Sequence, residues 1–323
     1  DFKGENLITG TIKGVAENRT PTVYFLSGHG EKSLDSYTKF TTNLTNYNYA
    51  AKELNLSETD SVPDDAALVL VAAPSKDITD AEAEKLNAYL DNGGNISLLM
   101  SPNGGAFAYT NLEAIMKDYG FYMDYDRVSE TNSNYHISGD KYTIQCELNE
   151  LDDDSEATDL TSSLLNQGLY TFMPESRSFR YNDEGGKYTI APLITTYDSA
   201  EGEPYGGVSD DPEKQSGQML LAADSTSIAR NDSKMVVFGN AEFIDDEHVS
   251  DDTVIVPVYL FLSTISWMYD SDIDMEISTK STTNDYISLQ DAGFAKGLMV
   301  VLTVIPVAIM AAGIGIWIKR RNS

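Results

Sequence analysis

The chain has 323 residues, enough for one large domain or two small ones. Hydrophobic residues make up 41% of it and aromatic residues 10%, so it can build a core and wholesale disorder is excluded. Its formal net charge of −29 repels nucleic acid and anionic lipid, which excludes both as ligands of the soluble part.

The first part of the chain alternates strand-like and helix-like segments. Residues 22–26 are a short β-rich run, 33–47 are predicted to be a helix, and 49–56 return as a strand. Residues 67–72 are continuously apolar, a pattern typical of a strand that is covered on both faces.

The next helix is predicted from its end signals. Thr79-Asp80-Ala81-Glu82 is a capping box, and the glycine pair at 93–94 ends the helix. Residues 95–100 form another strand, and Thr110 or Asn111 is expected to cap a short helix. Strands and helices that alternate at this spacing predict a parallel sheet with helices on both faces.

The second part of the chain is less regular. Residues 127–186 lose the periodicity and are predicted to be an insertion of loops and antiparallel strands. The α/β pattern resumes with strands at 188–197, 218–223 and 234–238 and an amphipathic helix at 254–269. We therefore expect one α/β domain over residues 1–270, with a mostly parallel, flavodoxin-like sheet and a β-rich insertion.

The C-terminal region carries a candidate membrane span. Residues 297–318 contain no charged side chain, and a helix of this length would cross about 33 Å. An exposed strand and a polar linker at 271–296 precede it, and the basic tail at 319–323 follows it. By the positive-inside rule the tail is cytoplasmic and the acidic domain lies outside. An exported domain needs a signal or a first membrane helix, which we expect ahead of Asp1.

One face of the predicted span consists of small side chains. They recur at i, i+3, i+4 and i+7, a spacing that lets a second helix approach closely: Ala308, Ala311, Ala312 and Gly315. This face predicts a partner in the membrane, and the alternative is a lone anchor.

The strongest site candidate follows the first strand directly. Ser27-Gly28-His29-Gly30-Glu31 would lie at the carboxyl edge of the sheet, where ligands of open α/β folds gather. His29 and Glu31 could bind a ligand or transfer protons. The alternative is a tight turn in which His29 only hydrogen-bonds the loop.

Two later segments are predicted to reach the same edge. They supply Ser101 after the 95–100 strand, and Asn240 and Glu242 after the 234–238 strand, as possible partners of His29.

The sequence gives little support for a metal site or a catalytic nucleophile. With three histidines and one cysteine, no metal site or cofactor is predicted. The acidic run Asp245-Asp246-Glu247-His248 is interpreted as a solvated turn, and Cys146 as a small hydrophobe in a strand. Walker and Gly-x-Ser-x-Gly motifs are absent from the sequence.

The segment from Val23 to Glu31 resembles the opening signature of the GldG family, auxiliary components of ABC-type transport systems. Further matches keep their order along nearly the whole chain, more weakly over 127–186: residues 62–66, 73–74, 89–94, 236–243, Ile305-Pro306, Trp317 and 319–321.

The resemblance implies an extracytoplasmic domain similar in fold to class I glutamine amidotransferases, with an ABC permease and an ATPase as partners. The chain has Gly239-Asn240 where the family often has Gly-Asp, which weakens any role that needs a carboxylate there. The chain has no cysteine at a turn between a strand and a helix, so the similarity in fold to amidotransferases does not imply a catalytic nucleophile here.

Three functional hypotheses follow. The first is a non-enzymatic auxiliary of a bacterial ABC transport system, which binds a ligand not yet defined or associates with the permease at the cytoplasmic membrane. The second is an exported hydrolase or transferase that uses His29 and Glu31. The third is a purely structural interaction module. We favour the first.

Overall fold

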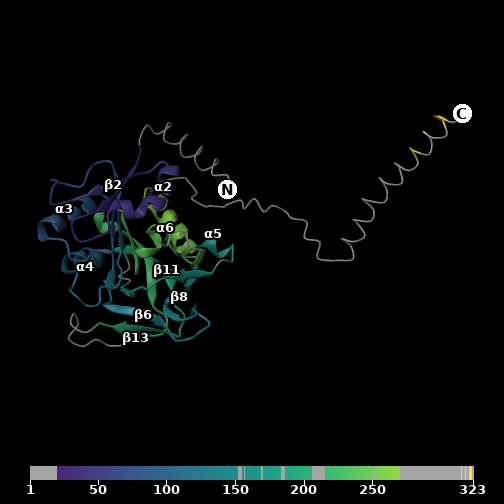
Figure 1. Cartoon of the computed structure of the whole chain (residues 1–323). Helices are drawn as coiled ribbons and strands as arrows, with labels where there is room; N and C mark the ends of the chain where they lie inside the picture. The colour runs from purple at the N-terminus through teal and green to yellow at the C-terminus, as the bar shows by residue number, and fades with distance from the viewer. Residues whose placement is uncertain are drawn as a thin grey trace. The chain divides into compact units, whose positions relative to one another are not determined.

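The computed structural model describes residues 20–269, except 152–154, 156, 169, 183–185, 206–214 and 250–251, together with Ile314, Trp317, Arg320 and Arg321 (Figure 1). Residues 20–269 belong to one compact unit, which is the subject of this section.

One half of the main sheet is parallel. Its strands run in the order β2-β1-β3-β4-β15, with bounds β1 Thr22–Leu26, β2 Ala50–Leu54, β3 Ala66–Ala72, β4 Ile96–Leu99 and β15 Ser233–Phe238. The first four strands along the chain, β1 to β4, all lie in this half. The strand order runs outward from β1 to β2 on one side and from β1 through β3 and β4 on the other, as in flavodoxin-like folds. The predicted parallel sheet is confirmed for these strands.

The other half is antiparallel. From β15 the order continues β14-β11-β8-β7, with β14 Leu220–Ser227, β11 Tyr188–Thr195, β8 Asp140–Leu148 and β7 His136–Ile137. The strands predicted at 188–197, 218–223 and 234–238 are all present, but only the last, β15, has a parallel neighbour, β4, whereas β11 and β14 are antiparallel. A parallel pair needs a long crossover, but only residues 228–232, which include the 3-10 turn η2 (Ile228–Arg230), join β14 to β15.

Residues 126–181 add short strands around this antiparallel half. They include β6 Asp126–Glu130, β9 Thr171–Met173, β10 Phe179–Tyr181 and the one-turn helix α5 Ser162–Leu165. Strand β9 pairs with β8, and β10 pairs with β14 and with β5 (Phe121–Met123). A small second sheet has the order β13-β12-β6, with β13 Gln215–Ser216 and β12 Ala200–Pro204.

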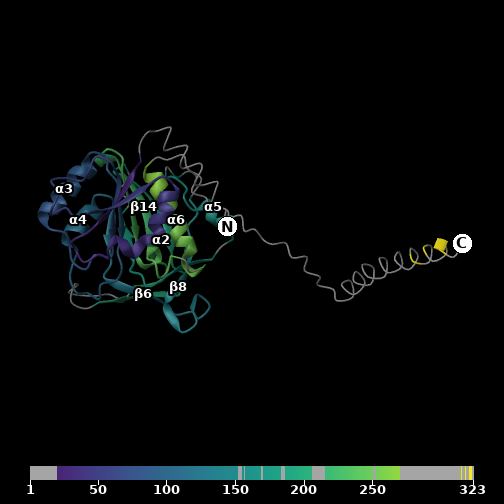
Figure 2. The ribbon, with the colours of Figure 1, turned by 45° about the horizontal axis from the view of Figure 1, so that its top comes forward.

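Helices cover both faces of the sheet (Figure 2). Helices α3 (Asp80–Asp91) and α4 (Thr110–Lys117) pack on one face, where Leu86 and Leu112 are fully buried. Helix α2 (Thr38–Asn46), which follows the 3-10 turn η1 (Leu34–Tyr37), and helix α6 (Ile255–Met268) pack on the other. Residues of β3 alternate between the two cores and are nearly all buried, which explains their continuous apolar run.

The two predicted helix starts have different outcomes. The capping box is confirmed, because the side chains of Thr79 and Glu82 both bond the opposite backbone N–H. The predicted cap at Thr110 or Asn111 is wrong. Residue Tyr109 occupies the cap position without a side-chain bond, and the carboxylate of Asp77 accepts hydrogen bonds from Asn111 N–H at 2.7 Å and Leu112 N–H at 3.3 Å.

Helix α6 is not amphipathic, contrary to expectation. Only a few of its side chains reach solvent, because the sheet, helix α2 and strand β9 surround it. The rings of Phe261 and Phe40 stack at 5.6 Å across the contact with α2. A helix that is enclosed in this way needs apolar residues all round.

The predicted C-terminal segments fall largely outside the described residues. These are the strand and linker at 271–296, the span at 297–318 apart from Ile314 and Trp317, and the face of Ala308, Ala311, Ala312 and Gly315. Within the part that the structure describes, no helix is long and apolar enough to cross a membrane.

Asp224, in the middle of β14, is an acid that is buried in the core. Its side chain is 1% exposed, and its Oδ2 has no hydrogen-bond partner among the described residues. Burial raises the pKa of this carboxyl well above its usual value. The positive charge of Lys234 lowers this pKa, but its effect is the smaller one.

We expect Asp224→Asn to stabilise the protein by about 1 kcal/mol or more at pH 7. A raised folded-state pKa means that the contribution of Asp224 is fully favourable only below its unfolded pKa, about 3.9, and is lost as the pH rises toward the folded value. The gain should therefore shrink toward pH 4 in thermal unfolding scans. The exposed Asp198→Asn serves as the control. An equal effect of Asp224→Asn at both pH values would show that the carboxyl does not titrate in this way.

Candidate functional site

The loop after β1 lies at the switch between β1 and β3, and its neighbours hold it closed. The carbonyl of His29 accepts hydrogen bonds from the N–H groups of Ser75 at 2.8 Å and Lys76 at 3.1 Å, both in the segment that follows β3. Gly30 has φ +83°, and a Cβ atom there would lie 1.7 Å from Ser75 Oγ. The positive φ favours glycine at position 30, and a larger residue would also have to displace the Ser75 hydroxyl.

The His29 side chain is buried between two carboxylates. It is 3% exposed, and its Nε2 lies 3.0 Å from Oε2 of Glu82 at the start of α3. Its Nδ1 lies 3.3 Å from Oε1 of Glu31, close enough for an ion pair although the geometry is not that of a hydrogen bond. The other Glu31 oxygen accepts from the backbone N–H of His29 at 2.7 Å. The ring thus joins the β1 loop to α3.

The charges of this cluster stabilise one another. Glu31, opposed by burial and supported by Glu82, raises the pKa of His29 above its usual value. Burial alone would raise the pKa of Glu82, but hydrogen bonds from Thr79 and from His29 outweigh it and hold this pKa at about 2. The Thr79 hydroxyl donates to Glu82 at 2.6 Å. The raised pKa of His29 and the lowered pKa of Glu82 both favour a protonated imidazole beside an ionised Glu82 carboxylate.

The other predicted residues form a separate group at the same edge of the sheet. Ser101 Oγ accepts from the N–H of Ala241 at 3.0 Å, which links the ends of β4 and β15. The amide of Asn240 donates to the carbonyl of Glu175 and accepts from the N–H of Glu242, each at 2.5 Å. Within the described part of the chain, no hydrogen bond or ion pair joins these residues to His29.

The acidic turn after β15 is only partly solvated, which corrects the sequence interpretation. The Asp245 side chain is 2% exposed, and it accepts a hydrogen bond from Lys32 Nζ at 2.6 Å and lies 2.8 Å from His248 Nδ1. Ligand atoms of Asp245, Glu247 and His248 lie within 4.8 Å of one another, the spacing of a metal site. The ammonium of Lys32 already pairs with Asp245 there, and together with the nearby carboxylates this raises the Lys32 pKa.

Sequence reasoning missed two residues at this edge. Glu82 was recognised only as a helix cap, since nothing in the sequence indicates that its carboxylate also reaches His29. Arg177 lies in the region of weak periodicity and carries no motif, yet it is fully buried beside Ser101, whose carbonyl accepts from its Nη2 at 2.9 Å.

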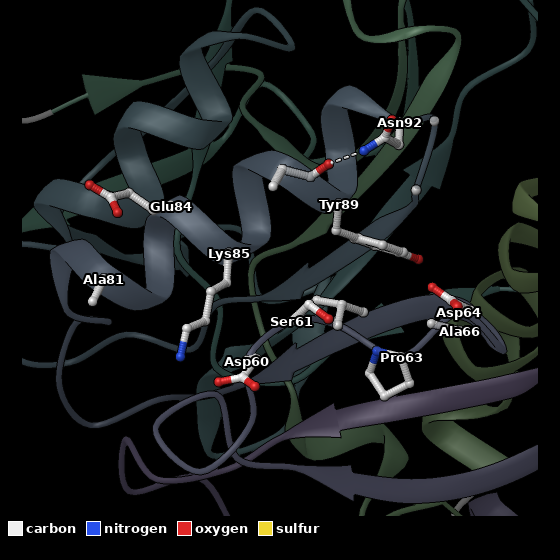
Figure 3. A pocket seen from close by; sticks show the side chains of 14 residues that line it. Asp60, Ser61, Pro63, Asp64, Ala66, Ala81, Glu84, Lys85, Tyr89 and Asn92 are labelled. Carbon is white, nitrogen blue, oxygen red and sulfur yellow. Dashed lines mark hydrogen bonds between the residues drawn. The ribbon is translucent and has the colours of Figure 1, made fainter.

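A groove of about 710 Å³ lies elsewhere, between α3 and the segment that precedes β3 (Figure 3). Its rim carries Asp60, Asp64 and Glu84, and Lys85 on its wall donates to the carbonyls of Leu56 and Thr59, both at 2.7 Å. None of the residues that the sequence singled out as a site lines this groove.

The fold has a counterpart among solved structures. The chain is similar to a structure named "mmIFT52 N-terminal domain", with a TM-score of 0.58 and 16% sequence identity over 78% of this chain and 99% of that chain. At this identity the similarity describes the fold alone. No curated protein matches the chain in sequence.

A sequence family matches most of the α/β domain. The model of a family described as an ABC-type uncharacterized transport system matches residues 20–257, from β1 through the start of α6. The match covers the parallel strands, the His29 loop and the Arg177 segment together. The chain therefore belongs to this family of ABC-type transport systems, as an auxiliary component.

Proposed function

We propose that the chain is a non-enzymatic auxiliary subunit, similar to the GldG type, that associates with the permease and ATPase of an ABC transport system. The family match over residues 20–257 is the observation that carries this proposal. We also propose that residues 297–318 anchor it in the cytoplasmic membrane, with the acidic domain outside. The uncharged 22-residue run and the basic tail support this topology.

Two features argue against catalysis by His29 or Cys146. A general base or nucleophile needs an atom that can reach a substrate, but His29 is 3% exposed and both of its ring nitrogens face carboxylates. Cys146 is also 3% exposed, and burial raises the pKa of its thiol far above the usual value, so little reactive thiolate is available. The hydrolase or transferase alternative thus has no accessible reactive group at these two positions.

Purification of the full-length chain from native membranes in mild detergent tests the assignment. We expect an ABC permease and its ATPase to co-purify and to be identified by mass spectrometry. If the small-residue face of the span makes the contact, replacing Ala308, Ala311, Ala312 and Gly315 together by Leu should release the permease, since bulky side chains prevent close helix approach.

Both controls concern the membrane segment. The fourfold Leu variant keeps an uncharged span, so it should still be found in the membrane fraction. Replacing the intervening residues Ile309 and Ile314 by Leu leaves the small face intact and should leave co-purification unchanged. Recovery of the folded protein without any transporter component would contradict the auxiliary role.

A further inference from the structure

Arg177 lies at the carboxyl ends of two neighbouring parallel strands. Its backbone N–H donates to the carbonyl of Gly239, just after β15, at 3.0 Å. Its Nη2 donates to the carbonyl of Ser101, just after β4, at 2.9 Å. The two segments can approach this closely because residue 239 is a glycine. A Cβ atom on Gly239 would lie 2.2 Å from the carbonyl oxygen of Arg177.

The guanidinium has donors that nothing in the described part of the chain accepts. Arg177 is 0% exposed, and its Nε and Nη1 have no hydrogen-bond partner among the described residues. The rings of Tyr109 and Tyr125 lie 5.6 and 5.4 Å from its Cζ atom. The nearby Asp126 carboxylate bonds Ser178 instead, at 2.9 Å to its N–H and 2.8 Å to its hydroxyl.

An unpaired buried cation is costly, and a ligand that supplies the missing charge would remove this cost. Arginine donors fit the oxygens of carboxylates and phosphates. Ligands of open α/β folds gather at the carboxyl edge of the sheet. At this edge the charges of the His29 cluster are already paired with one another, whereas no described carboxylate pairs with the Arg177 guanidinium.

We propose that the edge between β4 and β15 binds an oxyanion, a carboxylate or phosphate group of a small ligand, through Nε and Nη1 of Arg177. Because Arg177 has no exposed surface, the ligand enters after a local opening, which we place at the loop 101–107 that Arg177 contacts through Ser101. The proposal does not depend on the transporter role, since the purified chain alone can be tested.

Isothermal titration of the full-length chain with inorganic phosphate and, separately, with succinate tests the site. Sodium chloride at equal ionic strength is the blank. We expect saturable binding of at least one anion, and the anion that binds distinguishes a phosphate ligand from a carboxylate ligand. Binding should be at least tenfold weaker in Arg177→Gln and unchanged in Arg180→Gln, because the Arg180 side chain is 64% exposed.

A second measurement covers the case in which Arg177→Gln does not fold. In chain labelled with ¹⁵N-arginine, the Arg177 Nε–H signal, assigned with Arg177→Lys, should shift on addition of the bound anion. The proposal is wrong if neither anion binds saturably, if chloride at equal ionic strength has the same effect, or if Arg177→Gln binds as wild type does.

Discussion

Replacing His29 with alanine is expected to lower the free energy of unfolding by about 3 kcal/mol, because it leaves a buried carboxylate without its partner. The ring lies 3.0 Å from Glu82 and 3.3 Å from Glu31, and it connects the β1 loop to α3. Urea unfolding of wild type and variant measures the difference.

The effect should depend on pH in a defined way. Folding raises the pKa of His29. The stabilisation by His29 is therefore fully present below the pKa of the unfolded state, near 6.5, and is lost as the pH rises through the pKa of the folded state. The pKa of Glu82 is lowered to about 2, so its contribution is present above about 4.5 and is lost as the pH falls toward 2. The difference between wild type and variant should be largest between about pH 4.5 and 6.5.

A matched histidine provides the control. Among the described residues, the side chain of His136 bonds only the carbonyl of Ile137, at the surface, so His136→Ala should change stability by less than about 0.5 kcal/mol. A His29→Ala variant as stable as wild type would refute the buried ion pair. A variant that folds normally and still co-purifies with the permease would show that His29 is not needed for that interaction.

Gly239→Ala is expected to cost about 3 kcal/mol or more, since the new methyl group has no space. Its Cβ would lie 2.2 Å from the carbonyl oxygen of Arg177 and 3.2 Å from its carbonyl carbon. These are backbone atoms, which cannot turn aside as a flexible side chain can. The end of β15 and the Arg177 segment would have to separate, and the hydrogen bond between Arg177 N–H and the Gly239 carbonyl would be lost.

Thermal and urea unfolding of Gly239→Ala test this expectation. Gly139→Ala is the comparison, because a Cβ atom there meets nothing within 4 Å and the cost is limited to its positive φ of +88°, about 1 kcal/mol. If the two variants lose equal stability, the close approach at Gly239 is not tight. Any oxyanion binding by Arg177 should weaken in Gly239→Ala alongside the loss of stability.

The sequence by itself determined the parallel half of the fold. The strand at 67–72 must be covered on both faces because it has no polar position, and the capping box at 79–82 defines where α3 begins. Both signals lie within a few consecutive residues, so they can be recognised without knowledge of distant contacts. The loop from Ser27 to Glu31 was recognised for the same reason.

Only the tertiary structure decided how distant segments meet. The pairing of β14 with β11 and β15, the Asp77 cap on α4 and the contact between His29 and Glu82 each join residues that carry no sign of one another locally. Arg177 shows this most clearly: an arginine in an irregular segment predicts an exposed charge, yet the fold buries it near two tyrosine rings. Burial and charge pairing depend on which parts of the chain come together, so local sequence patterns cannot reveal them.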